Sequence, residues 1–93
     1  MACQGWPTDG PTVARVSGQS DEATALVMLG RAVRAARKAN GLSQEALADV
    51  AGIDRSHMGK IERGERNVTF LNIVRISRAL KMPAAKLILD AGL

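Results

Sequence analysis

Residues 44–63, QEALADVAGIDRSHMGKIER, constrain the fold of this chain more than any other segment, because they predict two short helices at a fixed crossing. Apolar residues recur at helical spacing in both halves, and these are Leu47, Ala48 and Ala51 in the first and Met58 and Ile61 in the second. Gly52 lies between the halves and readily adopts the left-handed backbone conformation that a tight turn requires. Ile53 is expected to plug that turn from inside.

The second of these helices has a polar outer face. With its apolar stripe inside, helical spacing places His57 at the flank and turns outward Arg55, Ser56, Gly59, Lys60 and Arg63. Two helices joined in this way form a helix-turn-helix motif, whose second helix enters the major groove of DNA. Arg and Lys donate to guanine O6 and N7, while Ser and His serve bases or phosphates. Gly59 costs the helix about 1 kcal/mol relative to alanine, and it reflects either close approach to DNA or simple tolerance of a weak helix former.

A resemblance to a known family extends beyond this motif and is carried by three segments, GRAVRAARKANGLSQEALADVAG, IDRSHMGKIERGERN and TFLNIVRISRALKMPAAKLI. Residues 29–90 resemble the Cro/C1-type helix-turn-helix domain through the run S-Q-E-x-L-A-x-x-A-G-I followed by I-E-R-G. This resemblance implies an all-α, compact, five-helix phage-repressor-like domain that regulates transcription by binding specific DNA sequences. The stretch DRSHMGKIERGERNVT also resembles restriction–modification controller proteins, which are small, dimeric autoregulators.

The charge of the chain is divided unevenly between its two parts. Residues 1–22 carry one basic and three acidic side chains, whereas residues 23–93 carry twelve basic and six acidic ones. A basic globular part of this size is expected to attract a polyanion, although a charge that serves only solubility would look the same. Residues 1–20 are rich in Gly, Pro, Ser and Thr and predict a disordered tail, while residues 21–93 predict one domain.

Five helices are expected in that domain. The first should begin near Asp21 or Glu22 and end near Asn40 and Gly41. The other boundary residues are Ser43, Asp54 and Thr69 as N-caps of the next three helices and Pro83 in the first turn of the last. The residues expected on the inner face of the fourth helix are Phe70, Ile73, Ser77 and Leu80, with Ile76 beside them.

Arg37 and Glu62 are expected to form a structural ion pair. In the resembled family these two positions commonly hold a partly buried pair that joins the first helix to the third. Burying either charge alone is expensive, whereas the pair satisfies both. Glu62 is therefore not interpreted as a catalytic acid.

Double-stranded DNA is the expected partner, and two sets of residues are expected to contact it. By resemblance to the family, Arg55, Ser56 and Lys60 read base edges, with His57 at a base or a nearby phosphate. The residues expected to contact phosphates are Ser43, Gln44, Arg63, Arg66 and Asn67. Among them, Gln44 opens a helix whose free backbone N–H groups and dipole favour a phosphate.

Spare apolar surface near the C-terminal end predicts a symmetric homodimer. One recognition helix reads only a few base pairs, so two related by a twofold axis are usually needed, and they imply a palindromic operator. The residues expected in the dimer interface are Leu71, Val74, Ile88, Leu89 and Leu93. Contiguous exposed apolar patches usually mark an interface. The alternative is that the last helix buries these side chains against the rest of the domain.

The sequence indicates neither an enzyme nor a metal site. His57 is the only histidine and Cys3 the only cysteine, and no phosphate-binding loop or nucleophile motif appears. No cofactor and no small-molecule ligand is expected. The chain shows no signal peptide and no stretch of membrane-spanning length, so a cytoplasmic protein is expected.

One alternative function stays open at this stage. Some antitoxins share this domain, bind a partner toxin and also bind their own operator. Co-purification of a small partner protein from the native host would favour the antitoxin hypothesis. Activation and repression also stay open, since the same dimer does either depending on where its site lies.

Overall fold

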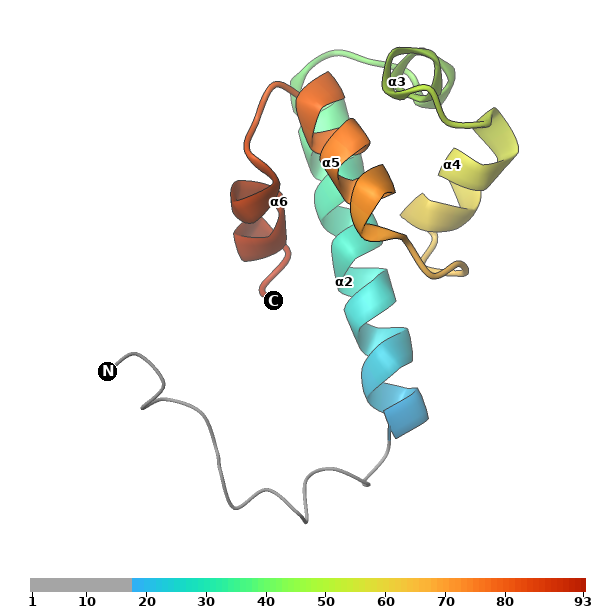
Figure 1. Ribbon diagram of the computed structural model, residues 1–93, viewed down its shortest axis with the longest axis vertical. Helices are drawn as coiled ribbons and strands as arrows, with labels where there is room; N and C mark the ends of the chain where they lie inside the picture. Colours follow the sequence, from blue (N-terminus) through green and yellow to red (C-terminus); the bar gives the residue numbers. More distant parts are fainter. Residues whose placement is uncertain (1–17) are drawn as a thin grey trace.

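The structure is a computed structural model that describes residues 18–93, with side chains described from residue 22. Within this part of the chain there are five helices and no strand, which confirms the predicted all-α fold (Figure 1). The helices are α2 (Gly18–Ala39), α3 (Gln44–Ala51), α4 (Arg55–Glu62), α5 (Phe70–Ala79) and α6 (Ala84–Asp90). No helix in the described range is long and apolar enough to cross a membrane.

The first described helix begins earlier than predicted. Helix α2 begins at Gly18 rather than at Asp21 or Glu22, so residues 18–20 belong to it and not to the expected tail. The change in composition at Ser20 does not set the start of the helix. The N–H groups of a first turn have no intrahelical partner in any case, so weak helix formers are accepted there. The rest of the expected tail, residues 1–17, lies outside the described residues. At the other end α2 stops at Ala39, and Gly41 has a φ of 71°, as expected of a C-terminal stop.

Local hydrogen bonds explain where α3, α4 and α5 begin. The Ser43 side chain accepts from the N–H of Ala46, and the Thr69 side chain accepts from the N–H of Asn72. The Asp54 carboxylate accepts from two N–H groups of the first turn of α4. All three residues are N-caps as predicted. Pro83 differs slightly from its prediction, because it is the N-cap residue of α6 and not part of its first turn.

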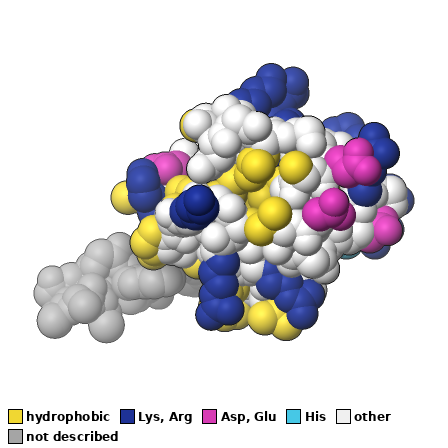
Figure 2. All heavy atoms as spheres, turned by 90° about the horizontal axis from the view of Figure 1, so that it is seen from above, with side chains coloured by type: hydrophobic (Ala, Val, Ile, Leu, Met, Phe, Trp, Pro, Cys, Tyr) yellow, Lys and Arg dark blue, Asp and Glu magenta, His cyan; other side chains and the backbone are white. Residues whose placement is uncertain are grey.

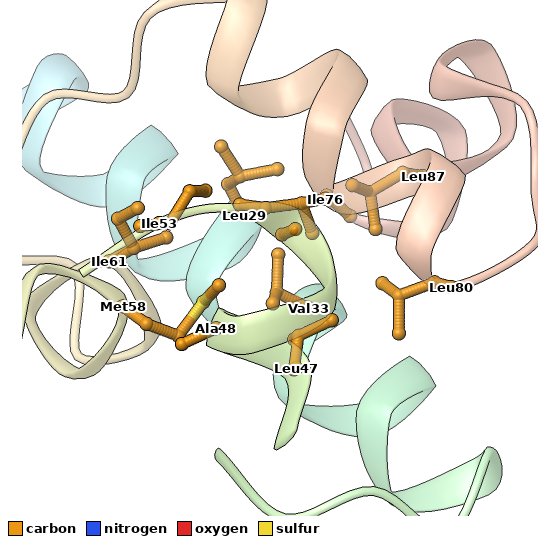
Figure 3. Close-up of a cluster of buried hydrophobic side chains, with 12 residues drawn as sticks. Leu29, Val33, Leu47, Ala48, Ile53, Met58, Ile61, Ile76, Leu80 and Leu87 are labelled. Atoms are coloured by element: carbon orange, nitrogen blue, oxygen red, sulfur yellow. The ribbon is translucent and has the colours of Figure 1, made fainter. Parts of the chain in front are cut away.

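Every helix contributes apolar side chains to one core (Figure 3). The buried residues of this core are Leu29, Val33, Leu47, Ala48, Ala51, Ile53, Met58, Ile61, Ile76, Leu80, Leu87 and Ala91. Ser77 is also buried, and its hydroxyl donates to the carbonyl of Val74 at 2.9 Å. The core therefore includes both stripes of the α3–α4 pair and the isoleucine that plugs the turn between them.

Phe70 is the clear exception to the predicted core. Its side chain is 76% exposed, whereas Ile76, expected only beside the inner face, is 1% exposed. Phe70 is the first residue of α5, and a helical side chain lies over the turn that precedes its own Cα. Helical periodicity places Phe70 on the inner side, but as the first residue of α5 it has no earlier turn of that helix to lie over.

Helix α2 contacts the α3–α4 pair mainly through α4. It packs against α4 and α6, while α3 packs against both α4 and α5. Helices α2 and α4 approach closely at Gly30, where an added Cβ would lie 2.6 Å from the carbonyl oxygen of Ile61 and 2.5 Å from that of Glu62. A residue without a side chain is therefore needed there, and the C-terminal end of α4 rests directly on the backbone of α2.

Candidate nucleic-acid interface

Helix α4 turns its polar side chains outward from a buried stripe. Met58 and Ile61 are 0% and 1% exposed, which fixes the rotation of the helix about its axis. Arg55 and Ser56 are exposed, and the residues predicted beside them, His57 and Lys60, are half-buried. The structure therefore brings the four predicted base-contacting residues together on one helix.

Gly59 lies on the predicted outer side of α4, beside Ser56 and Lys60, but it is buried there. The ends of two long side chains cover it, so an added Cβ would lie 3.2 Å from Arg63 Nη1 and 3.3 Å from Gln44 Oε1. The glycine thus makes room for side chains from both α3 and the end of α4.

Asp54 holds the first turn of α4 through a compact set of hydrogen bonds. Its Oδ2 atom accepts from the hydroxyl of Ser56 at 2.6 Å, and from the backbone N–H groups of Ser56 and His57 at 3.0 and 3.3 Å. The Ser56 hydroxyl, followed by these N–H groups, keeps the pKa of the Asp54 carboxyl below its usual value. Because the Ser56 proton points toward this carboxylate, its oxygen presents lone pairs to the outside.

The predicted ion pair between Arg37 and Glu62 is present. Arg37 Nε donates to Glu62 Oε2 at 2.7 Å, and Arg37 Nη2 donates to Glu62 Oε1 at 3.0 Å, while the two side chains are 12% and 3% exposed. Gln44 Nε2 also donates to Glu62 Oε1 at 3.2 Å, a contact that the sequence reasoning missed. This third member ties the first residue of α3 to the last residue of α4.

Two other predicted contact residues already have acidic neighbours. Arg63 donates to the carboxylate of Glu65 at 2.9 and 3.3 Å, and these hydrogen bonds raise the pKa of Arg63 and lower that of Glu65. Arg55 Nη1 lies 3.9 Å from the carboxylate of Glu45, and both side chains are largely exposed. Such exposed pairs are weak and exchange readily for a stronger anion.

Two open clefts flank the outer ridge of α4, which is formed by Ser56 and Lys60. The cleft toward α3, called here the α3 cleft, has a volume of about 410 Å³ and is lined by Gln44, Arg55, Ser56, Gly59, Lys60 and Arg63. The cleft toward α5, called here the α5 cleft, has a volume of about 420 Å³ and is lined by Gly52, Ile53, Asp54, Ser56, His57, Lys60, Arg66, Asn72 and Arg75. Ser43 and Asn67 are exposed but line neither cleft.

A match to a known protein family identifies this arrangement of helices as a helix-turn-helix domain. The sequence model described as helix-turn-helix matches residues 33–87, which span the described domain from the middle of α2 into α6. The chain belongs to the Cro/C1-type helix-turn-helix family. In this helix-turn-helix protein α3 is the bracing helix and α4 is the recognition helix.

Individual relatives of this helix-turn-helix protein are control proteins. The chain is 41% identical over 66 residues to control protein C.SmaI from Serratia marcescens, covering 71% of this chain and 79% of that one. It is 42% identical over 55 residues to control protein C.BamHI from Bacillus amyloliquefaciens, covering 58% and 68%. The crystal structure of the restriction–modification controller protein C.AhdI from Aeromonas hydrophila superposes with a TM-score of 0.66 at 47% identity, covering 67% of this chain and 94% of that one.

Apolar side chains are exposed on parts of the helix-turn-helix domain outside the recognition helix. Three residues of the predicted dimer interface are among them, with exposed fractions of 55% for Leu71, 74% for Leu89 and 54% for Leu93. The other two, Val74 and Ile88, are half-buried, and Ile88 packs against the core.

Figure 2 shows one face of the molecule with apolar side chains at its centre, basic side chains around them, and acidic side chains mainly on the right. Val50, at 65% exposed, is a further accessible apolar side chain that the sequence reasoning did not anticipate. Among the residues whose side chains are described, no group of three or more His, Cys, Asp or Glu residues is placed to hold a metal ion.

Proposed function

We propose that this protein is a transcriptional regulator of the restriction–modification controller kind, which binds a palindromic DNA operator as a homodimer. The observation that carries the proposal is the polar outer side of the recognition helix, where Arg55 and Ser56 are exposed, in a domain that is 47% identical to controller protein C.AhdI. The similarity to control proteins also supports a regulator over an antitoxin. A regulator of this kind shares its compartment with DNA, so the proposal includes a cytoplasmic location.

The base contacts are assigned to polar side chains on the outer side of α4. The Arg55 guanidinium, with a side chain that is 70% exposed, can exchange its 3.9 Å contact with Glu45 for the O6 and N7 atoms of a guanine. Ser56 is held by Asp54 with its lone pairs outward, which suits an adenine or cytosine amino group. Lys60 and His57 follow on the same helix, where they reach a neighbouring base or phosphate.

The phosphate contacts are assigned to both ends of the α3–α4 pair. Ser43 and Gln44 stand at the start of α3, where backbone N–H groups and the helix dipole attract an anion. Arg63 lies in the α3 cleft, while Arg66 and Asn67 follow the recognition helix as exposed side chains. Gln44 is also held by Glu62, so its position relative to the recognition helix is fixed.

The dimer is assigned to the exposed apolar surface of α5 and α6. Leu71, Leu89 and Leu93 are more than half exposed, and a monomer leaves them in water. Val74 and Ile88 extend this surface toward the core. A twofold axis through it implies two half-sites with centres about 34–36 Å apart.

Selection from randomised duplexes tests the DNA-binding proposal. The wild type should enrich a palindrome, and Arg55→Ala should weaken binding to it about tenfold to a hundredfold while relaxing the choice at one base pair. Arg34→Ala, which removes an exposed arginine of α2, is the matched control and should bind as the wild type does. No enrichment from the pool would refute the proposed function, and equal losses on selected and scrambled duplexes would reduce Arg55 to a phosphate contact.

Sedimentation equilibrium tests the dimer. The wild type should be dimeric at micromolar concentration and Leu89→Glu should be monomeric, because the change places a charge in the proposed apolar interface. Val50→Glu is the matched control, since Val50 is an exposed apolar residue of α3 outside that interface. A wild type that stays monomeric and binds one half-site as well as the palindrome would contradict the dimer.

A further inference from the structure

One basic side chain that lines the α5 cleft, Arg75, has no role in the DNA contacts assigned above. Arg75, on the exposed side of α5, lines this cleft together with Lys60 and Arg66. The next two residues of α5, Ile76 and Ser77, are 1% and 2% exposed, so the backbone that carries Arg75 is held in the core. An arginine on a fixed helix thus faces the same hollow as residues of the recognition helix.

The charges of this cleft are unbalanced toward the positive. Three cations, Lys60, Arg66 and Arg75, face it, and within the described part of the chain none of them forms an ion pair. The one carboxylate in the lining, that of Asp54, is already engaged with the hydroxyl and N–H of Ser56 and the N–H of His57. An anion entering the cleft would therefore meet three cations and one carboxylate, so the lining carries a net positive charge.

The position of the cleft indicates which anion. A helix seated in the major groove has one sugar–phosphate strand on each side, and the groove is only about 12 Å wide. The two clefts lie on opposite sides of the Ser56–Lys60 ridge, so each one faces one strand. The start of α3 and Arg63 account for the strand on the side of the α3 cleft.

We infer that the α5 cleft binds a phosphate of the opposite strand, with Arg75 as a phosphate ligand supplied by α5. This inference rests on the proposed DNA-binding function and extends it to a helix outside the helix-turn-helix motif. The planar guanidinium suits a bidentate contact with phosphate oxygens. With contacts on both strands, the ridge of α4 is centred in the groove rather than tilted toward one wall.

The salt dependence of DNA binding tests the role of Arg75. On the duplex selected by the wild type, Arg75→Gln should reduce the slope of log K against log salt by about one and weaken binding to selected and scrambled duplexes alike. Arg78→Gln is the matched control, because Arg78 is an exposed arginine of the same helix that does not line the α5 cleft. The control should keep the wild-type slope, and thermal unfolding should show both variants as stable as the wild type.

Duplexes with a single neutral methylphosphonate locate the contact. At one backbone position the substitution should weaken the wild type but cause no further loss in Arg75→Gln, as expected when both changes remove the same interaction. An unchanged slope for Arg75→Gln, or an equal loss for Arg78→Gln, would overturn the inference while leaving the proposed function intact. If the wild type selects no duplex, the proposed function itself fails.

Titration with inorganic phosphate separates DNA from a free anion as the source of the ligand. Saturable phosphate binding that depends on Arg75, together with an unchanged salt slope for DNA, would reassign the cleft to a free anion and overturn the inference. Absence of such binding, with the reduced slope, would support the DNA phosphate.

Discussion

Replacing Gly30 by alanine should destabilise this domain, although the same change in most helices is stabilising. Alanine is better than glycine in a helix by about 1 kcal/mol. Here, however, the new Cβ would lie 2.5 Å from the carbonyl oxygen of Glu62, where ordinary contacts begin at 3.4 Å, so the helices must separate by about 0.9 Å. The obstacle is backbone and cannot rotate away, so the overpacking penalty is about 3 kcal/mol. The expected net loss is about 2 kcal/mol.

Thermal unfolding followed by circular dichroism measures this loss. For a domain of this size a loss of about 2 kcal/mol lowers the Tm by about 8–16 °C. Gly59→Ala is the informative comparison, because its Cβ would meet only the ends of the Arg63 and Gln44 side chains, at 3.2 and 3.3 Å. That variant should be as stable as the wild type or slightly more stable. A Gly30→Ala variant with an unchanged or raised Tm would refute the close approach of α2 to α4.

Three further perturbations have defined outcomes. Arg37→Ala leaves the buried carboxylate of Glu62 without its cation, so urea denaturation should show a loss of about 3–5 kcal/mol, and a much smaller loss in the Arg37→Leu/Glu62→Leu double variant. The folded-state pKa of Asp54 is depressed, so its stabilisation is present above the ordinary carboxyl value of 3.8 and is lost as the pH falls through the lower folded value. Unfolding from pH 6 to about pH 2 should therefore show the stability difference between the wild type and Asp54→Asn shrinking with acid; a constant difference would contradict this assignment. Phe70→Ala should change the free energy of unfolding by no more than about 0.5 kcal/mol, because the side chain is 76% exposed, and a loss of several kcal/mol by urea denaturation would place Phe70 in the core.

Features that depend on neighbours in sequence were predictable. An N-cap needs only a side-chain oxygen and the N–H groups two or three residues later, so Ser43, Asp54 and Thr69 could be identified directly. The left-handed turn at Gly52, with a φ of 73°, is equally local. The Arg37–Glu62 pair spans 25 positions and was accessible only through the resemblance to the family.

Features that depend on how distant helices meet were not predictable. Gly30 looks like a tolerated weak helix former until α4 is placed against it. Phe70 satisfies the helical period but stands at the end of α5, where burial depends on what lies beneath that turn. Gly59 was expected on the outside. Helical periodicity gives the side of the helix on which a residue lies, but not whether long neighbouring side chains cover it. The role inferred for Arg75 likewise appears only when α5 and α4 are seen to share a cleft.

Glu62 connects the stability of the fold to the geometry of the candidate DNA surface. Its carbonyl abuts Gly30 of α2, and its carboxylate binds Arg37 of α2 and Gln44 of α3. The end of the recognition helix is thus fixed in two directions, through backbone contact with one helix and through charged hydrogen bonds with two. Gln44 also lines the α3 cleft. Any change that shifts the Glu62 carboxylate therefore moves a proposed phosphate contact relative to the proposed base-contacting residues of α4. Losses of stability and of DNA affinity at this position should therefore occur together, whereas changes at Arg55 or Arg75, which are exposed, should alter affinity alone.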